Sequence, residues 1–296
     1  MRTTLFDESG LAAIYPGSPA WAAMQSFCRT GVLSEAQSAA FRSASPIATE
    51  PPDGIAIVPV YGVITQSSSV FSALFGGTSL DGLQATLMQL RDDTSIRSIV
   101  LHFRSPGGGV YGVDETADVI AEVRKRKRVA AFTDSMCASA AYWLASACER
   151  IVATPSAELG SIGVYAVHFD YSKQLAEEGV VPTLVKAGEH KAEANPYQPL
   201  SDEDHAAMQS RIDAYYSLFT KRVARGRAVG VELVRGETFG DGRVVGAQQA
   251  VTAGMADEIG TFGDVLRGMS RDTSTRAAQA ADSTLALRAR LSGVAC

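Results

Sequence analysis

The sequence lacks several features that would assign it to particular protein classes. It has four cysteines, which are Cys28, Cys137, Cys148 and Cys296. None of them forms a CxxC pair or has the spacing of a metal site, so we expect reduced thiols, no disulfide framework and no metal. The N-terminus carries acidic residues where an export signal needs an apolar run, so no signal peptide is expected.

The sequence also lacks a long apolar helix and an excess of basic residues. The uncharged stretch 54–80 contains a proline, several glycines and consecutive serines, which favours a strand and loop over a membrane span. Lys and Arg number 27 against 32 Asp and Glu, for a net charge of −5. Nucleic-acid binding is not expected, because phosphate neutralisation needs a basic surface. The basic run 124–128 is interpreted as a solvated helix end. We predict a soluble protein with no membrane anchor.

The 296 residues allow two small domains or one large one. Residues 1–52 mix short apolar pieces with prolines and are predicted to form a lead-in and linker. Residues 53–270 are predicted to be the main domain, with a smaller unit at about 231–270. Residues 271–296, rich in Ala, Ser, Thr and Arg, are predicted to be a mobile tail.

Apolar runs and amphipathic segments alternate through the main domain. Strands are predicted at 55–60, 98–103, 129–132, 151–153, 163–168 and 183–185, and helices at 79–92, 112–127, 140–148 and 170–178. The longest helix should begin after Ser201, a good N-cap, and end at Gly226 or Gly230. Strands separated by helices indicate βαβ units, so the sequence predicts an α/β fold with a mostly parallel sheet.

Ser139 is the main candidate for a nucleophile. It lies between a predicted strand and a predicted helix, and the small residues Cys137 and Ala141 flank it. Small neighbours permit the tight turn of a nucleophile elbow. The N–H of Ala140, at the start of the helix, could then bond an oxyanion. Ser139 could also serve only as a helix N-cap.

A glycine-rich segment, Ser105-Pro106-Gly107-Gly108-Gly109, follows a predicted buried strand. The proline is expected to end that strand, and the glycines let the backbone approach a ligand closely. Free N–H groups there make an anion or oxyanion site, although an ordinary strand-to-helix turn has the same composition. The spacing matches neither a dinucleotide fingerprint nor a phosphate-binding loop.

A nucleophilic serine needs a base. The four histidines are His102, His168, His190 and His205, and none has an evident acidic orienter in the sequence, so a Ser-His-Asp triad is unsupported. Lys191, in a loop bracketed by Gly188 and Pro196, could act as a desolvated neutral amine or be an ordinary surface lysine. Ser161, in a small-residue turn, could bond a lysine amine or satisfy its own turn.

Four motifs in order resemble the signal peptide peptidase A (protease IV) family of Ser–Lys proteases. They are Ser105-Pro106-Gly107-Gly108, Ala138-Ser139-Ala140, Gly160-Ser161-Ile162-Gly163-Val164 and His190-Lys191. The resemblance covers about residues 54–265. It is closer still to the head maturation (capsid) proteases of lambda-like tailed phages, which share the Gly-x-His-Lys-x-x-x-Asn-Pro-Tyr loop at 188–197 and the Gln-Ser-Arg-x-Asp-Ala helix at 209–214.

The resemblance implies that Ser139 is the nucleophile and Lys191 the general base. Ser161 would hold the lysine amine, and Gly108 would form the oxyanion hole together with the Ala140 N–H. The family usually has two glycines after the nucleophile, whereas this chain has two alanines, which keep the main-chain N–H. The resemblance also implies a crotonase-like (Clp-like) spiral of βα units and a ring-shaped homo-oligomer.

The implied function is that of a serine endopeptidase that needs no cofactor. Its substrates would be scaffold, portal or capsid proteins, or its own chain, inside the phage prohead assembling in the host cytoplasm. The missing signal favours this role over a bacterial enzyme that degrades cleaved signal peptides. The chain could instead be a catalytically inert capsid or scaffold component. A crotonase-type acyl-CoA enzyme would use the same oxyanion geometry but would leave Ser139 and Lys191 unexplained.

Overall fold

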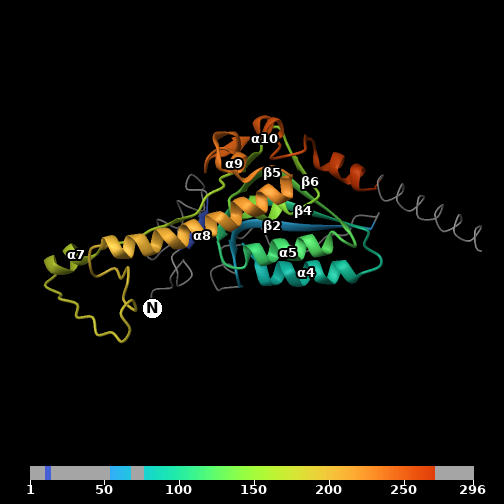
Figure 1. Cartoon of the computed structure of the whole chain (residues 1–296). Helices are drawn as coiled ribbons and strands as arrows, with labels where there is room; N and C mark the ends of the chain where they lie inside the picture. Colours follow the sequence, from blue (N-terminus) through green and yellow to red (C-terminus); the bar gives the residue numbers. More distant parts are fainter. Residues whose placement is uncertain (1–10, 15–53, 68–76, 271–296) are drawn as a thin grey trace, which may run out of the picture.

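The computed structural model describes residues 11–14, 54–67 and 77–270 (Figure 1), and within them ten strands form one sheet. The strands are β1 (Leu11–Ile14), β2 (Ile55–Thr65), β3 (Thr78–Ser79), β4 (Ser98–Gly109), β5 (Arg128–Ala138), β6 (Arg150–Ala153), β7 (Glu158–Gly160), β8 (Tyr165–Ala166), β9 (Val244–Gly246) and β10 (Glu258–Ile259). The helices are α4 (Leu80–Asp92), α5 (Val113–Val123), α6 (Ala140–Ser146), α7 (Ser172–Glu177), α8 (Asp202–Arg227), α9 (Val231–Arg235), the 3-10 helix η1 (Glu237–Phe239), α10 (Ala247–Ala253) and a last helix at 262–270.

The centre of the sheet is parallel, as predicted. Its strands lie in the order β2, β4, β5 and β6, and each pairs in parallel with the next. The runs 98–103 and 129–133 are buried at every residue. Strands buried on both faces have continuous apolar sequences, which is why the sequence identified them.

Two hydrophobic clusters lie on opposite faces of this sheet. Leu101 belongs to a large cluster that includes the buried sides of α4, α5 and α6 and part of α8, whereas the preceding residue, Val100, packs with Met269 of the last helix. Neighbouring residues of a strand point to opposite faces, so the helices cover the sheet on both sides. The chain is therefore an α/β protein with a parallel-rich sheet.

The last predicted unit, 231–270, is part of the same sheet. Its strand β9 pairs with β7, and β10 pairs with β6. The lead-in also contributes, because β1 pairs with β4 and β8. The rest of the lead-in and the predicted tail lie outside the described residues.

Three expectations about strands need correction. The glycine-rich segment does not end its strand, because β4 continues through Pro106 to Gly109, with register shifts against both β2 and β5. Such irregularities let a strand accommodate proline. The strand predicted at 163–168 is shorter in the structure, where it is β8. No strand forms at 183–185, where Val185 is 94% exposed and no strand of the described residues pairs with it.

α8 begins as predicted but ends differently. The Ser201 hydroxyl accepts a hydrogen bond from the Asp204 N–H at 3.0 Å. The helix passes through Gly226 and ends at Arg227, and Ala228 adopts a left-handed conformation with φ 54°. Gly226 is needed for a close helix contact, since a Cβ there would lie 1.9 Å from the Ser146 carbonyl oxygen. In the described part of the chain, no helix has both the length and the apolar character to cross a membrane.

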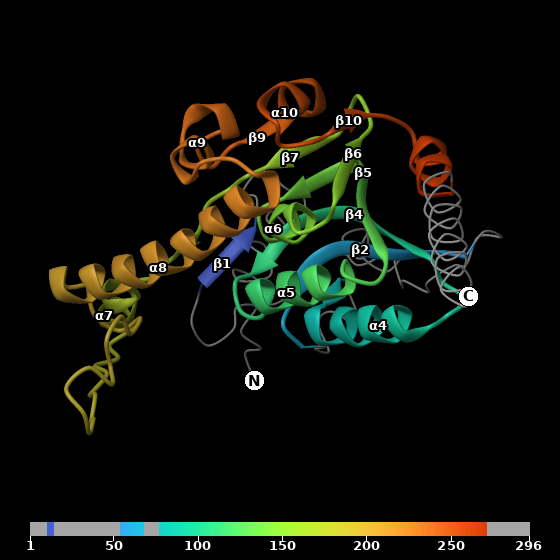
Figure 2. The same cartoon turned by 45° about the vertical axis from the view of Figure 1, so that its right-hand side comes forward.

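An arm projects from the body. It comprises residues 167–210, that is α7, the following loop and the first part of α8 (Figures 1 and 2). The other end of α8 packs on the body, where the Phe219 ring stacks on Trp143 of α6 with centroids 4.5 Å apart. The arm is thus carried on a long helix that is anchored at one end.

The basic run 124–128 is engaged within the chain. Arg124 donates to a main-chain carbonyl at 2.8 Å, and Lys127 donates to two others. Arg128 pairs with Glu149 at 2.7 Å. The interpretation of the run as a solvated helix end is therefore only partly right, because residues 124–126 are exposed but contacts within the chain hold the run in place.

Two of the four cysteines lie in the described part of the chain. Cys137 and Cys148 are free and buried. Burial raises the pKa of both thiols, that of Cys148 to about 12, so they are protonated at neutral pH.

Candidate active site

Ser139 occupies a sharp turn between β5 and α6. Its φ of 55° and ψ of −123° lie in a region that residues with a side chain rarely adopt. Ala138 ends β5, Ala140 begins α6, and both are fully buried. The segment therefore has the strand–turn–helix geometry of a nucleophile elbow, as the sequence predicted.

The hypothesis that Ser139 serves only as a helix cap is not supported. Its side chain makes no capping hydrogen bond to α6, whereas Ser79 and Ser201 do cap their helices. The main chain of Ser139 is held on both sides. Its N–H donates to the Gly160 carbonyl at 2.6 Å, and its carbonyl accepts from the Trp143 N–H at 2.9 Å.

Ser161 lies at the same edge of the sheet as Ser139, because the strands that precede them pair. β5 and β7 are parallel, and their register matches Ala138 with Gly160. Ser161 also has a positive φ, 52°, and its N–H donates to the Arg243 carbonyl at 2.8 Å. The side chains of both serines are inside the protein, since Ser139 is 1% and Ser161 5% exposed. The structure therefore brings these two predicted residues together.

Gly108 lies on the segment of β4 that passes between two other strands. It pairs with Ile64 of β2 on one side and with Ala13 of β1 on the other. A Cβ at Gly108 would lie 1.8 Å from the Ile64 carbonyl oxygen. Only glycine permits this close contact between two strands, whereas the approach of the segment to a ligand stays a prediction.

Ser105 fixes the glycine segment, and the sequence placed it in the motif without giving it a role of its own. Its buried hydroxyl donates to the Gly62 carbonyl at 2.6 Å and accepts from the Gly107 N–H at 3.1 Å. Ser105 also pairs with Cys137 of β5, two residues before Ser139. The glycine segment therefore runs alongside the strand that leads to Ser139. The only sequence signal was the position of this serine directly before Pro-Gly-Gly.

Lys191 is not brought to Ser139 within one chain. It is exposed, and its loop lies on the arm, where a loop N–H donates to the Asp204 carboxylate at 3.2 Å. α8 contacts α6 through its other half, where Phe219 stacks on Trp143. Asp204 and Phe219 are roughly 22 Å apart along the helix, at about 1.5 Å per residue. The neighbouring acid Glu193 contacts His190 rather than Lys191.

His102 does have an acidic partner, contrary to the sequence-based expectation. One ring nitrogen lies 3.1 Å from Asp134 and the other 2.7 Å from the Tyr61 hydroxyl. Arg104 makes two hydrogen bonds to the same carboxylate, and these, the largest cause, lower the pKa of Asp134 to about 2. Burial lowers the pKa of His102, so its ring is neutral at pH 7.

This histidine is far from Ser139. It pairs with Phe132 on β5, and roughly 23 Å of extended chain, at about 3.3 Å per residue, separates Phe132 from Ser139. The other three histidines lie on the arm, where His168 bonds a loop carbonyl at 3.0 Å. No described histidine is therefore placed to form a triad with Ser139 in the same chain.

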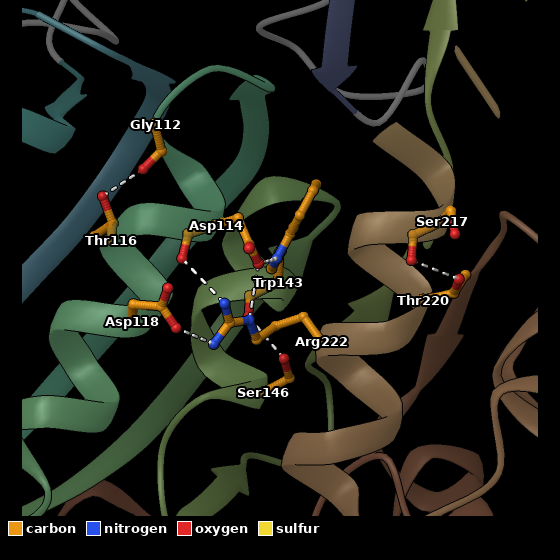
Figure 3. Close-up of polar contacts among 9 residues, drawn as sticks. All are labelled: Gly112, Asp114, Thr116, Asp118, Trp143, Ser146, Ser217, Thr220 and Arg222. Carbon is orange, nitrogen blue, oxygen red and sulfur yellow. Dashed lines mark hydrogen bonds and ion pairs between the residues drawn. The ribbon is translucent and has the colours of Figure 1, made fainter. Parts of the chain in front are cut away.

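The buried Arg222 anchors α8 to α5, which Trp143 links in turn to α6, the helix that follows Ser139 (Figure 3). Its guanidinium donates to Asp114 at 2.8 Å and to Asp118 at 2.6 Å, and the hydrogen bond to Asp114 is the largest cause of the raised pKa of Arg222. Trp143 donates its indole N–H to the same Asp114 oxygen at 3.2 Å. The network was not predicted. Its one sequence signal is the i,i+4 spacing of the two aspartates, which places them on one face of α5.

These features together define a class of site. A strained, buried serine at a strand–helix turn, a second buried serine beside it and a glycine segment along the same edge match the arrangement that serine hydrolases use for acyl transfer. Residues 121–276 match the model of Peptidase family S49. The chain belongs to this family.

Comparison with curated proteins agrees. The chain is 36% identical over 217 residues to capsid assembly protease C of Escherichia phage lambda, covering 73% of this chain and 49% of that protein. It is 36% identical over 218 residues to the head–tail preconnector protein GP5 of Enterobacteria phage P21, covering 74% and 43%. It is 30% identical over 191 residues to a putative signal peptide peptidase SppA of Enterococcus faecium, covering 63% and 54%. The chain thus spans about half the length of these relatives.

Proposed function

We propose that the protein is a serine endopeptidase in which Ser139 is the nucleophile and Lys191 the general base. The observation that carries the proposal is the strained turn at buried Ser139 next to Ser161, in a member of a peptidase family. The Gly108 and Ala140 N–H groups would bind the oxyanion. Ser161 would orient the lysine amine without adding charge.

The reaction follows from these roles. The Lys191 amine takes the proton of the Ser139 hydroxyl as its oxygen attacks the substrate carbonyl carbon. The resulting oxyanion is held by main-chain N–H groups, and the lysine then gives the proton to the leaving amine. Water hydrolyses the acyl-enzyme by the same steps and restores the serine. No cofactor takes part in this scheme.

Lys191 would act on Ser139 of a neighbouring copy. A lysine in water is almost entirely protonated at neutral pH, so a lysine base needs a desolvated position, and Lys191 is exposed within one chain. The arm that carries it also exposes large apolar side chains, among them Phe169 at 48%, Val181 at 86% and Val185 at 94%. Contiguous exposed apolar residues mark interaction surfaces. A homo-oligomer, with a ring as its expected form, would cover them and bring the lysine to the serine.

The biological role that we propose is capsid maturation. Two relatives at 36% identity are phage proteins named a capsid assembly protease and a head–tail preconnector protein, whereas a putative signal peptide peptidase is 30% identical. Scaffold, portal or capsid proteins would be the substrates, within the phage prohead in the host cytoplasm. We also propose that the α/β sheet belongs to a crotonase-like spiral and that 53–270 is the protease domain.

Mixing of inactive variants tests the dyad and the shared site together. Ser139→Ala and Lys191→Ala should each fail to hydrolyse casein. Each junction of a head-to-tail ring would combine the serine of one copy with the lysine of the next. In an equal mixture, about half of the copies keep the serine and about half keep the lysine, so about a quarter of the junctions would combine both. Recovery of about a quarter of the wild-type rate is expected. Full activity of either variant alone refutes the dyad, and no recovery refutes the shared site.

A further inference from the structure

The short strand β1 is bound at the edge of the proposed site, although it is distant in sequence from everything it contacts. Residues 12–14 pair antiparallel with residues 109–107 of β4. On its other side β1 pairs antiparallel with β8, where Leu11 is opposite Ala166. β1 (dark blue in Figure 2) therefore fills a slot between two strands.

The walls of this slot are elements of the proposed catalytic site. One wall contains Gly108, the proposed oxyanion donor, which is paired with Ala13. That wall is also the segment of β4 that Ser105 ties to the end of β5, next to Ser139. The other wall, β8, follows shortly after Ser161.

A slot of this kind suits one class of ligand. Two strands that both offer main-chain groups bind an extended polypeptide through backbone hydrogen bonds, largely independently of its sequence. An endopeptidase must hold its substrate extended with one carbonyl at the oxyanion hole. β1 already has this extended conformation, and its register places Ala13 opposite the oxyanion glycine.

We propose that residues 11–14 are the enzyme's own first substrate, bound in its substrate slot and cleaved between Ala13 and Ile14. This inference rests on the proposed function. Ser139 Oγ attacks the Ala13 carbonyl carbon, its proton passes through the Lys191 amine to the Ile14 nitrogen, and the C–N bond breaks. Water then hydrolyses the ester to leave an Ala13 carboxylate and the free serine. Until this segment leaves, it excludes other polypeptides from the slot.

A time course on the full chain tests the proposal. Intact-mass measurements of freshly purified wild type should show the loss of residues 1–13 and a new N-terminus at Ile14, whereas Ser139→Ala should remain intact. Casein hydrolysis by wild type should start after a lag that matches this cleavage. Ala13→Pro should remain intact and hydrolyse casein without a lag, because proline cannot donate to a strand ladder. The control Ala23→Pro, which leaves residues 11–14 unchanged, should behave as wild type.

A binding measurement separates occupation of the slot from catalysis. The probe is a fluorescent peptide with the sequence of residues 7–18, and its binding is followed by fluorescence anisotropy. It is titrated with two proteins, the single variant Ser139→Ala and the double variant that carries Ala13→Pro as well. The double variant should bind at least tenfold more tightly, because its own strand no longer competes. Equal binding by the two variants overturns the occupation of the slot by β1.

The outcomes also distinguish this inference from the proposed function. Casein hydrolysis without a lag, by a wild-type chain that keeps residues 1–13, overturns the inference and leaves the peptidase standing. No casein hydrolysis by either wild type or Ala13→Pro overturns the peptidase, and the self-cleavage with it.

Discussion

Gly108→Ala is the substitution whose effect on the site the structure predicts most sharply. The new Cβ would lie 1.8 Å from the Ile64 carbonyl oxygen, against an ordinary carbon–oxygen contact of about 3.3 Å. β2 and β4 must therefore separate by more than 1 Å at the proposed oxyanion hole. Displacement of a catalytic group by about 1 Å costs roughly 100-fold in rate, and loss of one oxyanion donor costs about 100- to 1000-fold.

We expect kcat for casein hydrolysis to fall at least 100-fold in Gly108→Ala, with KM little changed. Overpacking should also lower the free energy of unfolding by about 1–3 kcal/mol, which urea unfolding followed by circular dichroism will show. The matched control is Gly82→Ala in α4, where the Cβ would meet its nearest atom at 3.7 Å. This control should keep full activity and be slightly more stable, because alanine favours a helix. A folded Gly108→Ala enzyme with kcat within twofold of wild type would refute the assignment of this glycine.

The remaining predictions concern the base, the anchor of α8 and the ion pair beside the histidine. Lys191→Arg should be as inactive as an alanine variant in the casein assay, because a guanidinium stays protonated and cannot accept the serine proton; near-normal hydrolysis would exclude a lysine base. Arg222→Met should lower the free energy of unfolding by about 2–3 kcal/mol, since it leaves the partly buried Asp114 without its cation. The control is Arg267→Met, which removes an exposed ion pair. This control should change the free energy of unfolding by less than about 0.5 kcal/mol in the same urea titration. The arginine that bonds Asp134 lowers the pKa of this residue to about 2, below the value of about 3.9 for an unfolded chain. The ion pair therefore stabilises the fold above pH ~4, and this stabilisation is lost as the pH falls to ~2. Asp134→Asn should make the thermal-unfolding temperature fall less steeply with pH on the acid side, and an unchanged slope would contradict this.

Local sequence patterns determined most elements of the fold and pointed to the proposed nucleophile. Continuous apolar runs identified the central strands, and the Ser201 cap identified the start of α8. Small residues on both sides of Ser139 identified the elbow, because only they permit so tight a turn between a buried strand and a buried helix. These signals are local, so they can be detected before any long-range contact is known. The ordered motifs also identified the family that the comparisons show.

The tertiary structure decided which distant segments meet. The register between β5 and β7 placed Ser161 at the same edge as Ser139, and pairing on both sides carried β4 through Pro106, where the sequence predicted an end. It also inserted β1 beside Gly108 and gave His102 an acidic partner on another strand. Strand pairing depends on residues far apart in the chain, and local periodicity carries no information about that choice of partner. The position of Lys191 was likewise decided by the tertiary structure. The sequence assigned its loop to the site, but α8 holds this loop away from the serine of the same chain.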